Sequence, residues 1–225
     1  MLLCSSLLRA PEVHLGLAYA EEIDMWSLGV SVAELAMGTT PYPGHHPYDM
    51  VKFIVDTQGL PPDRLLWLGP HTNHCFERQR INGQDTWTLK TPAVIQMETG
   101  HKFCDSRKVV LTCLEDIMEL MDTNTTEKEG RQFVDLLNCM MCLDTEQRIR
   151  PAAVLEHPFL VEDSRQTDEP LVWAKETLDQ TEDVTPIVQE EEEEPAAIQP
   201  EAQAETRTTW RRHLTQAVRR MFCLC

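Results

Sequence analysis

The chain has 225 residues, of which 42 % are hydrophobic, and it carries a formal net charge of −17 at pH 7. This length and composition suit one globular domain with a stable core and some additional chain. No apolar run approaches the ~18 residues that a membrane-spanning helix needs, which argues against an integral membrane protein. The first residues also lack the basic region of a signal peptide, so we expect an intracellular protein.

The negative charge is concentrated in one segment. Residues 161–206 carry a net charge of −13, residues 207–225 carry +5, and residues 1–160 carry the remaining −9. Direct nucleic-acid binding is not expected of an acidic body, because the phosphate backbone attracts basic surfaces. The eight cysteines are scattered through apolar surroundings. That distribution is typical of reduced, intracellular thiols.

The first part of the body is predicted to be helical. Residues 24–37 are apolar on almost every face and are followed by Gly38, which predicts a helix buried all round. An apolar stripe from Tyr48 to Val55 predicts a second, amphipathic helix.

The rest of the body contains two more helical patterns. Residues 60–105 hold Gly, Pro, His and isolated aromatic residues, and they predict an ordered loop with little strand content. Apolar residues at helical spacing predict a third helix near 106–121 and a fourth near 131–142. The body, residues 1–160, is therefore predicted to be mainly α.

Two different segments follow the body. Residues 161–206 are rich in Glu, Pro, Gln and Thr, and we expect a disordered acidic linker because they cannot bury enough apolar area. Residues 207–225 predict a basic amphipathic helix, suited to an anionic membrane surface or to a peptide-binding groove. Cys223 and Cys225 at its end are candidate lipidation sites. The alternative is that this helix contacts the acidic linker or the body.

Four motifs in the body are more specific. Arg-Ala-Pro-Glu at 9–12 precedes Asp-Met-Trp-Ser-Leu-Gly at 24–29, and Asp-Thr-Glu-Gln-Arg-Ile-Arg-Pro at 144–151 precedes Glu-His-Pro-Phe-Leu at 156–160. In this order, and around an apolar helix, they resemble the C-terminal lobe of eukaryotic protein kinases. In that family an Ala-Pro-Glu motif closes the activation segment.

Further motifs narrow the resemblance. Tyr-Pro-Gly at 42–44, Thr-Gln-Gly-Leu-Pro at 57–61, Trp-x-Leu-Lys-Thr-Pro at 87–92 and Glu-Thr-Gly at 98–100 are similar to those of the homeodomain-interacting protein kinases. The resemblance covers about residues 1–160. It implies the fold of the helical kinase lobe and, for the complete domain, phosphorylation of Ser/Thr in proteins with Mg-ATP. It also implies protein substrates or kinase-binding proteins as partners and a location in the nucleus or cytoplasm.

The resemblance also implies roles for individual residues. Glu12 is expected to form a buried ion pair with Arg148 that ties the substrate-binding loop to the helices of the lobe. Asp24, Trp26 and Gly29 belong to the central-helix motif, in which the aspartate accepts hydrogen bonds from the catalytic loop. The alternative reading makes Glu12, Arg148 and Asp24 purely structural in this chain.

Two residues near the expected substrate-binding surface also match the family. Arg9 resembles the arginine that shapes the pocket for a proline after the phosphorylated residue. Ser5 stands where the family has a hydroxyl group near the catalytic aspartate. The activating tyrosine of the family is absent, since Ser-Leu-Leu-Arg stands at 6–9 in place of Arg-Tyr-Tyr-Arg.

The sequence contains no catalytic kinase motif. The Gly-rich loop, the strand lysine, the H-R-D loop and the D-F-G motif are all missing from the 225 residues. We therefore predict no catalytic residue and no cofactor in this chain, although the complete family domain uses Mg-ATP. The chain is expected to be either part of a kinase that is inactive alone or a non-catalytic interaction module.

Cysteine and histidine clusters give a weaker indication of metal binding. Cys139 and Cys142 are predicted to lie within the fourth helix as core residues. The long loop contains His71, His74 and Cys75, followed by His101-x-x-Cys104, but these spacings fit no common zinc site. We predict no metal site from the sequence.

Overall fold

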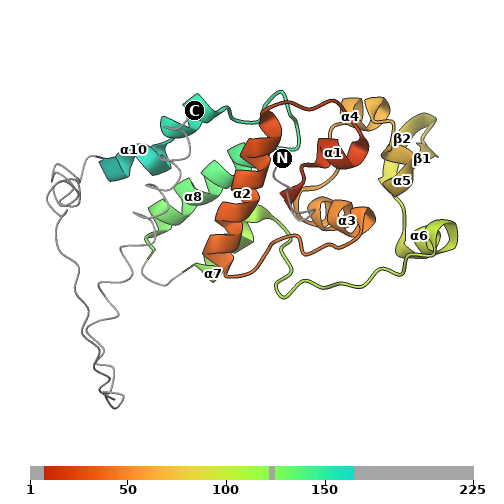
Figure 1. Ribbon diagram of the computed structural model, residues 1–225, viewed down its shortest axis with the longest axis horizontal. Helices are drawn as coiled ribbons and strands as arrows, with labels where there is room; N and C mark the ends of the chain where they lie inside the picture. The colour runs from red at the N-terminus through yellow and green to blue at the C-terminus, as the bar shows by residue number, and fades with distance from the viewer. Residues whose placement is uncertain (1–7, 122–124, 165–225) are drawn as a thin grey trace, which may run out of the picture. The chain divides into compact units, whose positions relative to one another are not determined.

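The computed structural model describes residues 8–121 and 125–164, in which a compact unit ends at Phe159 (Figure 1). The predicted basic helix at 207–225 lies outside the described residues, and so does the predicted linker apart from residues 161–164. No helix in the described part of the chain is long and apolar enough to cross a membrane.

The described chain is mainly helical, as predicted, with one two-stranded sheet. In chain order the elements are α1 (Pro11–Leu15), α2 (Glu22–Met37), α3 (Pro47–Gln58), α4 (Asp63–Leu68), α5 (Thr72–Cys75), β1 (Phe76–Ile81), β2 (Gln84–Leu89), α6 (Pro92–Thr99), the 3-10 helix η2 (Leu114–Asp116), α7 (Ile117–Leu120), α8 (Glu127–Met140), α9 (Pro151–Leu155) and α10 (Pro158–Ser164).

Helix α2 packs against α7 and α8 (Figure 1). It ends because Gly38 adopts the left-handed conformation, with φ of 68°, and donates its N–H to the carbonyl of Glu34. The prediction that this helix is buried all round is wrong for the described residues. Trp26 and Val30 are fully buried, whereas Asp24 is exposed and Leu35 is 72 % exposed. The side of α2 that carries Asp24 and Leu35 is therefore uncovered by the described chain.

A second apolar cluster joins α3 to the segment that follows it. Its buried residues are Leu15, Tyr48, Val51, Leu65, Leu66, Cys75, Phe76, Trp87 and Ile95. Tyr48 also donates its hydroxyl to the carbonyl of Lys90 at 2.6 Å. Residues of α1 and of the elements from α3 to α6 thus share one core, which fixes the segment at 60–105 against α1 and α3.

The prediction of an ordered loop with little strand content at 60–105 is wrong. This segment contains three short helices, α4, α5 and α6, and the antiparallel hairpin β1–β2. Asn82 and Gly83 connect the strands with φ of 52° and 81°, the backbone that an Asn-Gly hairpin turn requires. The Asn-Gly pair was therefore a sequence signal for the hairpin.

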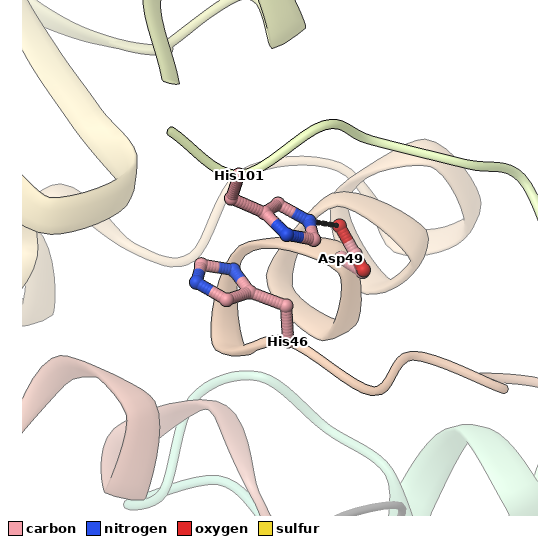
Figure 2. Close-up of side chains that lie close together, drawn as sticks. All are labelled: His46, Asp49 and His101. Carbon is pink, nitrogen blue, oxygen red and sulfur yellow. Dashed lines mark hydrogen bonds and ion pairs between the residues drawn. The ribbon is translucent and has the colours of Figure 1, made fainter. Parts of the chain in front are cut away.

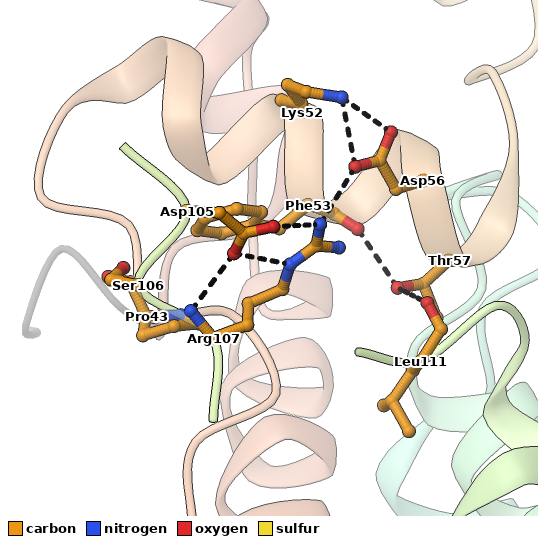
Figure 3. A network of polar contacts seen from close by, with 9 residues as sticks. All are labelled: Pro43, Lys52, Phe53, Asp56, Thr57, Asp105, Ser106, Arg107 and Leu111. Carbon is orange, nitrogen blue, oxygen red and sulfur yellow. Dashed lines mark hydrogen bonds and ion pairs between the residues drawn. The ribbon is translucent and has the colours of Figure 1, made fainter. Parts of the chain in front are cut away.

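The third predicted helix is also shorter than expected, because only residues 114–120 are helical. Residues 106–113 instead lie against α3 (Figure 3). Arg107 packs its guanidinium over the ring of Phe53, with 4.5 Å to the centroid, and pairs with Asp56 and Asp105. Thr57 donates its hydroxyl to the carbonyl of Leu111 at 3.3 Å. These tertiary contacts replace the helix that the apolar spacing predicted.

Helix α8 begins four residues before the predicted start. The Thr126 hydroxyl accepts from the N–H of Glu129, and the Glu129 side chain accepts from the N–H of Thr126. This capping box satisfies two backbone donors that a helix start leaves open. The helix ends at Met140, so Cys139 lies within it and Cys142 lies beyond it, contrary to the prediction.

Candidate functional site

The segment at 9–12 is anchored at the start of α1. Ala10 is the N-cap residue, and Pro11 occupies the first helical position, where a missing N–H costs nothing. Ala10 and Glu12 are each 1 % exposed. The local sequence therefore directs the carboxylate of Glu12 into the protein interior.

Glu12 and Arg148 form a fully buried ion pair. Arg148 donates from Nη1 to Oε1 at 2.6 Å and from Nη2 to Oε2 at 2.9 Å. Two further donors of the guanidinium reach the carbonyls of Glu22 at 3.0 Å and Cys142 at 2.9 Å. The guanidinium also lies over the ring of Trp26, 5.3 Å from its centroid. One side chain thus joins the start of α1, the start of α2 and the chain after α8.

The central-helix motif lies beside this ion pair. Gly29 faces α8 so closely that an added Cβ would lie 2.6 Å from Cγ of Met141. Ser27 donates its hydroxyl to the carbonyl of Leu8 at 3.0 Å. Asp24 is exposed, and its carboxylate has no hydrogen-bond partner among the described residues. The motif therefore holds α2 in the core while Asp24 remains open at the surface.

The substrate-side residues are only partly described. Arg9 is exposed, and Ser5 lies outside the described residues, as do Cys223 and Cys225. Burial, together with the charge of Arg9, lowers the pKa of His14 to about 4. His14 is therefore neutral at physiological pH, and its Nε2 is buried without a partner in the described chain.

A pocket of about 440 Å³ opens beside the ion pair. Its walls come from the connection between α1 and α2, which includes Tyr19, and from the segment around Glu146 and Arg150. Sequence reasoning did not predict this pocket, because its walls lie far apart in the chain.

The structure separates the cysteines and histidines that were considered as metal ligands. The rings of His71 and His74 stack on each other at 5.0 Å. Cys75 is buried, and burial raises the pKa of its thiol to about 11. His101 lies instead beside His46 and Asp49, a combination that the sequence analysis missed because His46 and His101 are far apart in sequence.

Comparisons with known proteins agree with the kinase motifs. A family model described as "Protein kinase domain" matches residues 2–160. Homeodomain-interacting protein kinase 2 of Mesocricetus auratus is 42 % identical over 162 residues, which cover 68 % of this chain and 14 % of that protein. Homeodomain-interacting protein kinase 1 of Mus musculus is 41 % identical over 160 residues, 68 % of this chain and 13 % of the relative.

A third relative shows the same pattern of coverage. Homeodomain-interacting protein kinase 4 of Homo sapiens is 34 % identical over 166 residues, which cover 68 % of this chain and 27 % of that protein. The chain thus spans about a quarter or less of the length of these curated relatives. The matched region contains both residues of the Glu12–Arg148 ion pair and the whole of α2. The chain belongs to the protein kinase family and is related to the homeodomain-interacting protein kinases.

Proposed function

We propose that the body of this chain is the C-terminal lobe of a Ser/Thr protein kinase domain. The observation that carries the proposal is the buried Glu12–Arg148 pair, whose carboxylate comes from the Ala-Pro-Glu motif. The pair fixes that motif to α2 through the contacts of Arg148 with Glu22 and Trp26. In this arrangement the described chain just before α1, which includes the exposed Arg9, would face a protein substrate.

We further propose that the 225-residue chain does not transfer phosphate by itself. Phosphoryl transfer depends on positioning ATP and magnesium with a Gly-rich loop, a strand lysine and two acidic motifs. None of these motifs occurs in the sequence. The residues of this chain would help to bind the protein substrate. Mg-ATP would be held by kinase segments that the sequence does not contain.

The second candidate function is a non-catalytic interaction module, and the open face of α2 favours it. Leu35 is 72 % exposed, and Leu28 is only partly buried on the same face. Together the two leucines offer a small apolar surface that a partner chain could cover. A lobe with such a face could occupy the partners or substrates of a complete kinase without phosphorylating them.

Titration of the purified chain with Mg-ATP tests the inactivity of the chain. We expect no saturable heat in calorimetry, no change in melting temperature and no phosphate transfer to a generic protein substrate. Saturable stabilisation by Mg-ATP would contradict the proposal, because it would require a phosphate site that the sequence motifs do not supply. Melting curves without nucleotide show that the protein tested is folded.

The C-terminal segment supports a separate proposal of membrane attachment. Its basic residues would attract anionic lipid, and one acyl chain added to a basic patch would give stable anchoring. Exchanging Cys223 and Cys225 for serine should move the protein from the membrane fraction of cells to the soluble fraction. An unchanged distribution would contradict lipid anchoring and would leave the kinase-lobe proposal untouched.

A further inference from the structure

Two histidines and a buried carboxylate meet where the start of α3 faces the chain after α6 (Figure 2). His46 is the N-cap residue of α3, Asp49 lies in its first turn, and His101 follows Gly100 at the end of α6. His101 Nε2 lies 2.7 Å from Asp49 Oδ1. The rings of His46 and His101 stack with their centroids 3.8 Å apart. One potential ligand atom from each residue lies within 4.8 Å of the other two.

We propose that His46, Asp49 and His101 bind a divalent transition-metal ion such as Zn²⁺. Two imidazoles and one carboxylate form a donor set that suits Zn²⁺ and similar ions, and three protein ligands leave a coordination position for water. The Asp49 side chain is 8 % exposed and that of His101 is 23 % exposed. The carboxylate is therefore largely withdrawn from water and supplies a negative charge beside the two rings.

A structural role explains only part of this cluster. The contact between Asp49 and His101 is sufficient to tie the chain after α6 to α3. The N-cap role of His46 is filled more often by Asn, Asp, Ser or Thr. The imidazole of His46 fills the cap, but a shorter polar side chain would do so equally well, whereas the imidazole also places a nitrogen donor against the ring of His101.

Metal binding would use the ring that now caps α3. The N–H of Tyr48 donates to Nδ1 of His46 at 3.2 Å. A metal-bound neutral imidazole carries its remaining proton on the other ring nitrogen, so it cannot also accept at that atom. The metal must therefore replace this single long hydrogen bond. It would in return link the chain after α6 to the start of α3.

Zinc titration of the full chain tests the proposal. The protein carries serine in place of Cys223 and Cys225, is kept reduced, and is freed of metal with a chelator. We expect Zn²⁺ to bind with a stoichiometry of one and to raise the melting temperature. His46→Asn keeps a capping side chain, and His101→Gln keeps a donor for Asp49, so both variants should fold. Each should weaken Zn²⁺ binding by at least about tenfold.

Two matched controls address histidines outside the cluster. His45→Gln changes the exposed neighbour of His46, and His71→Gln changes the other stacked histidine pair. Both variants should bind Zn²⁺ as tightly as the parent protein. Equal weakening by either control and by His46→Asn would overturn the proposal, because it would show unspecific binding to surface histidines.

Cobalt substitution identifies the donor atoms. Co²⁺ bound to nitrogen and oxygen gives visible bands without the near-ultraviolet charge-transfer band that a thiolate ligand adds. A second possible ligand group, Asp135, Cys139 and His157, contains a thiol and would give that band. A thiolate band that persists in His46→Asn and His101→Gln would overturn the proposal. So would the absence of saturable binding to the folded parent protein.

Discussion

Removing the carboxylate of Glu12 should strongly destabilise the folded body of the chain. Glu12→Gln keeps the size of the side chain but leaves the guanidinium of Arg148 buried without its counter-charge, since the two side chains are 1 % and 0 % exposed. Stranding one member of such a pair costs about 3–5 kcal/mol. That loss is a large share of the ~5–15 kcal/mol that stabilises a typical domain. The carbonyls of Glu22 and Cys142 remain as partners of Arg148 but carry no full charge.

Urea denaturation, followed by tryptophan fluorescence, measures this cost. For a domain of this size the loss corresponds to a melting temperature lower by roughly 10 °C. The double variant Glu12→Gln with Arg148→Met should lose less than the sum of the two single losses, because it leaves no stranded charge. The control is Arg131→Met, which removes the exposed ion pair with Glu127 and should cost less than about 0.5 kcal/mol. A loss for Glu12→Gln as small as that of the control would refute the reasoning.

Three further predictions concern α2 and the site around it. Gly29→Ala should lower the free energy of unfolding by about 1–3 kcal/mol, because the new Cβ would clash with Met141. The control Gly130→Ala in α8 should be neutral or stabilising by up to ~1 kcal/mol. Equal effects of the two substitutions in chemical denaturation would contradict the clash at Gly29. His14 has its pKa lowered by burial from 6.5 to about 4, so the unfolded chain takes up the proton first, and stability should fall by up to about 3 kcal/mol as the pH drops through that range. The same pH series on His14→Gln should lack this decrease, and identical profiles would count against a buried neutral histidine. Leu35→Gln should change stability by less than about 0.5 kcal/mol and reduce binding of a hydrophobic dye, while unchanged dye fluorescence would show that this face is covered.

The spacing of apolar residues predicted the helices that bury one continuous face. The apolar stripe from Tyr48 to Val55 lies within α3, and the fourth predicted helix overlaps most of α8. The central helix was located within two residues of its start. Its exposed face was not predicted, because the sequence shows apolar side chains on all sides and cannot show which neighbours cover them.

Tertiary contacts account for the errors. The spacing of apolar residues near 106–113 is helical, but Arg107 gains an aromatic face and two carboxylates on α3 only if that segment is not helical. The cluster of His46, Asp49 and His101 joins chain segments that are about fifty residues apart. No spacing rule connects such residues. The Glu12–Arg148 contact, by contrast, was expected from the family motifs, although the two residues are even farther apart in sequence.

A chimeric kinase tests the central claim most directly. It joins the part of homeodomain-interacting protein kinase 2 that precedes its Ala-Pro-Glu motif to residues 10–225 of this chain, which begin with that motif. Phosphate transfer to a protein substrate is measured with radiolabelled ATP. The account predicts that the chimera binds Mg-ATP and transfers phosphate, that its Arg148→Met variant loses most of this activity, and that the chain alone remains inactive. A chimera that folds cooperatively but neither binds nucleotide nor transfers phosphate would contradict the assignment of this body as a kinase C-terminal lobe.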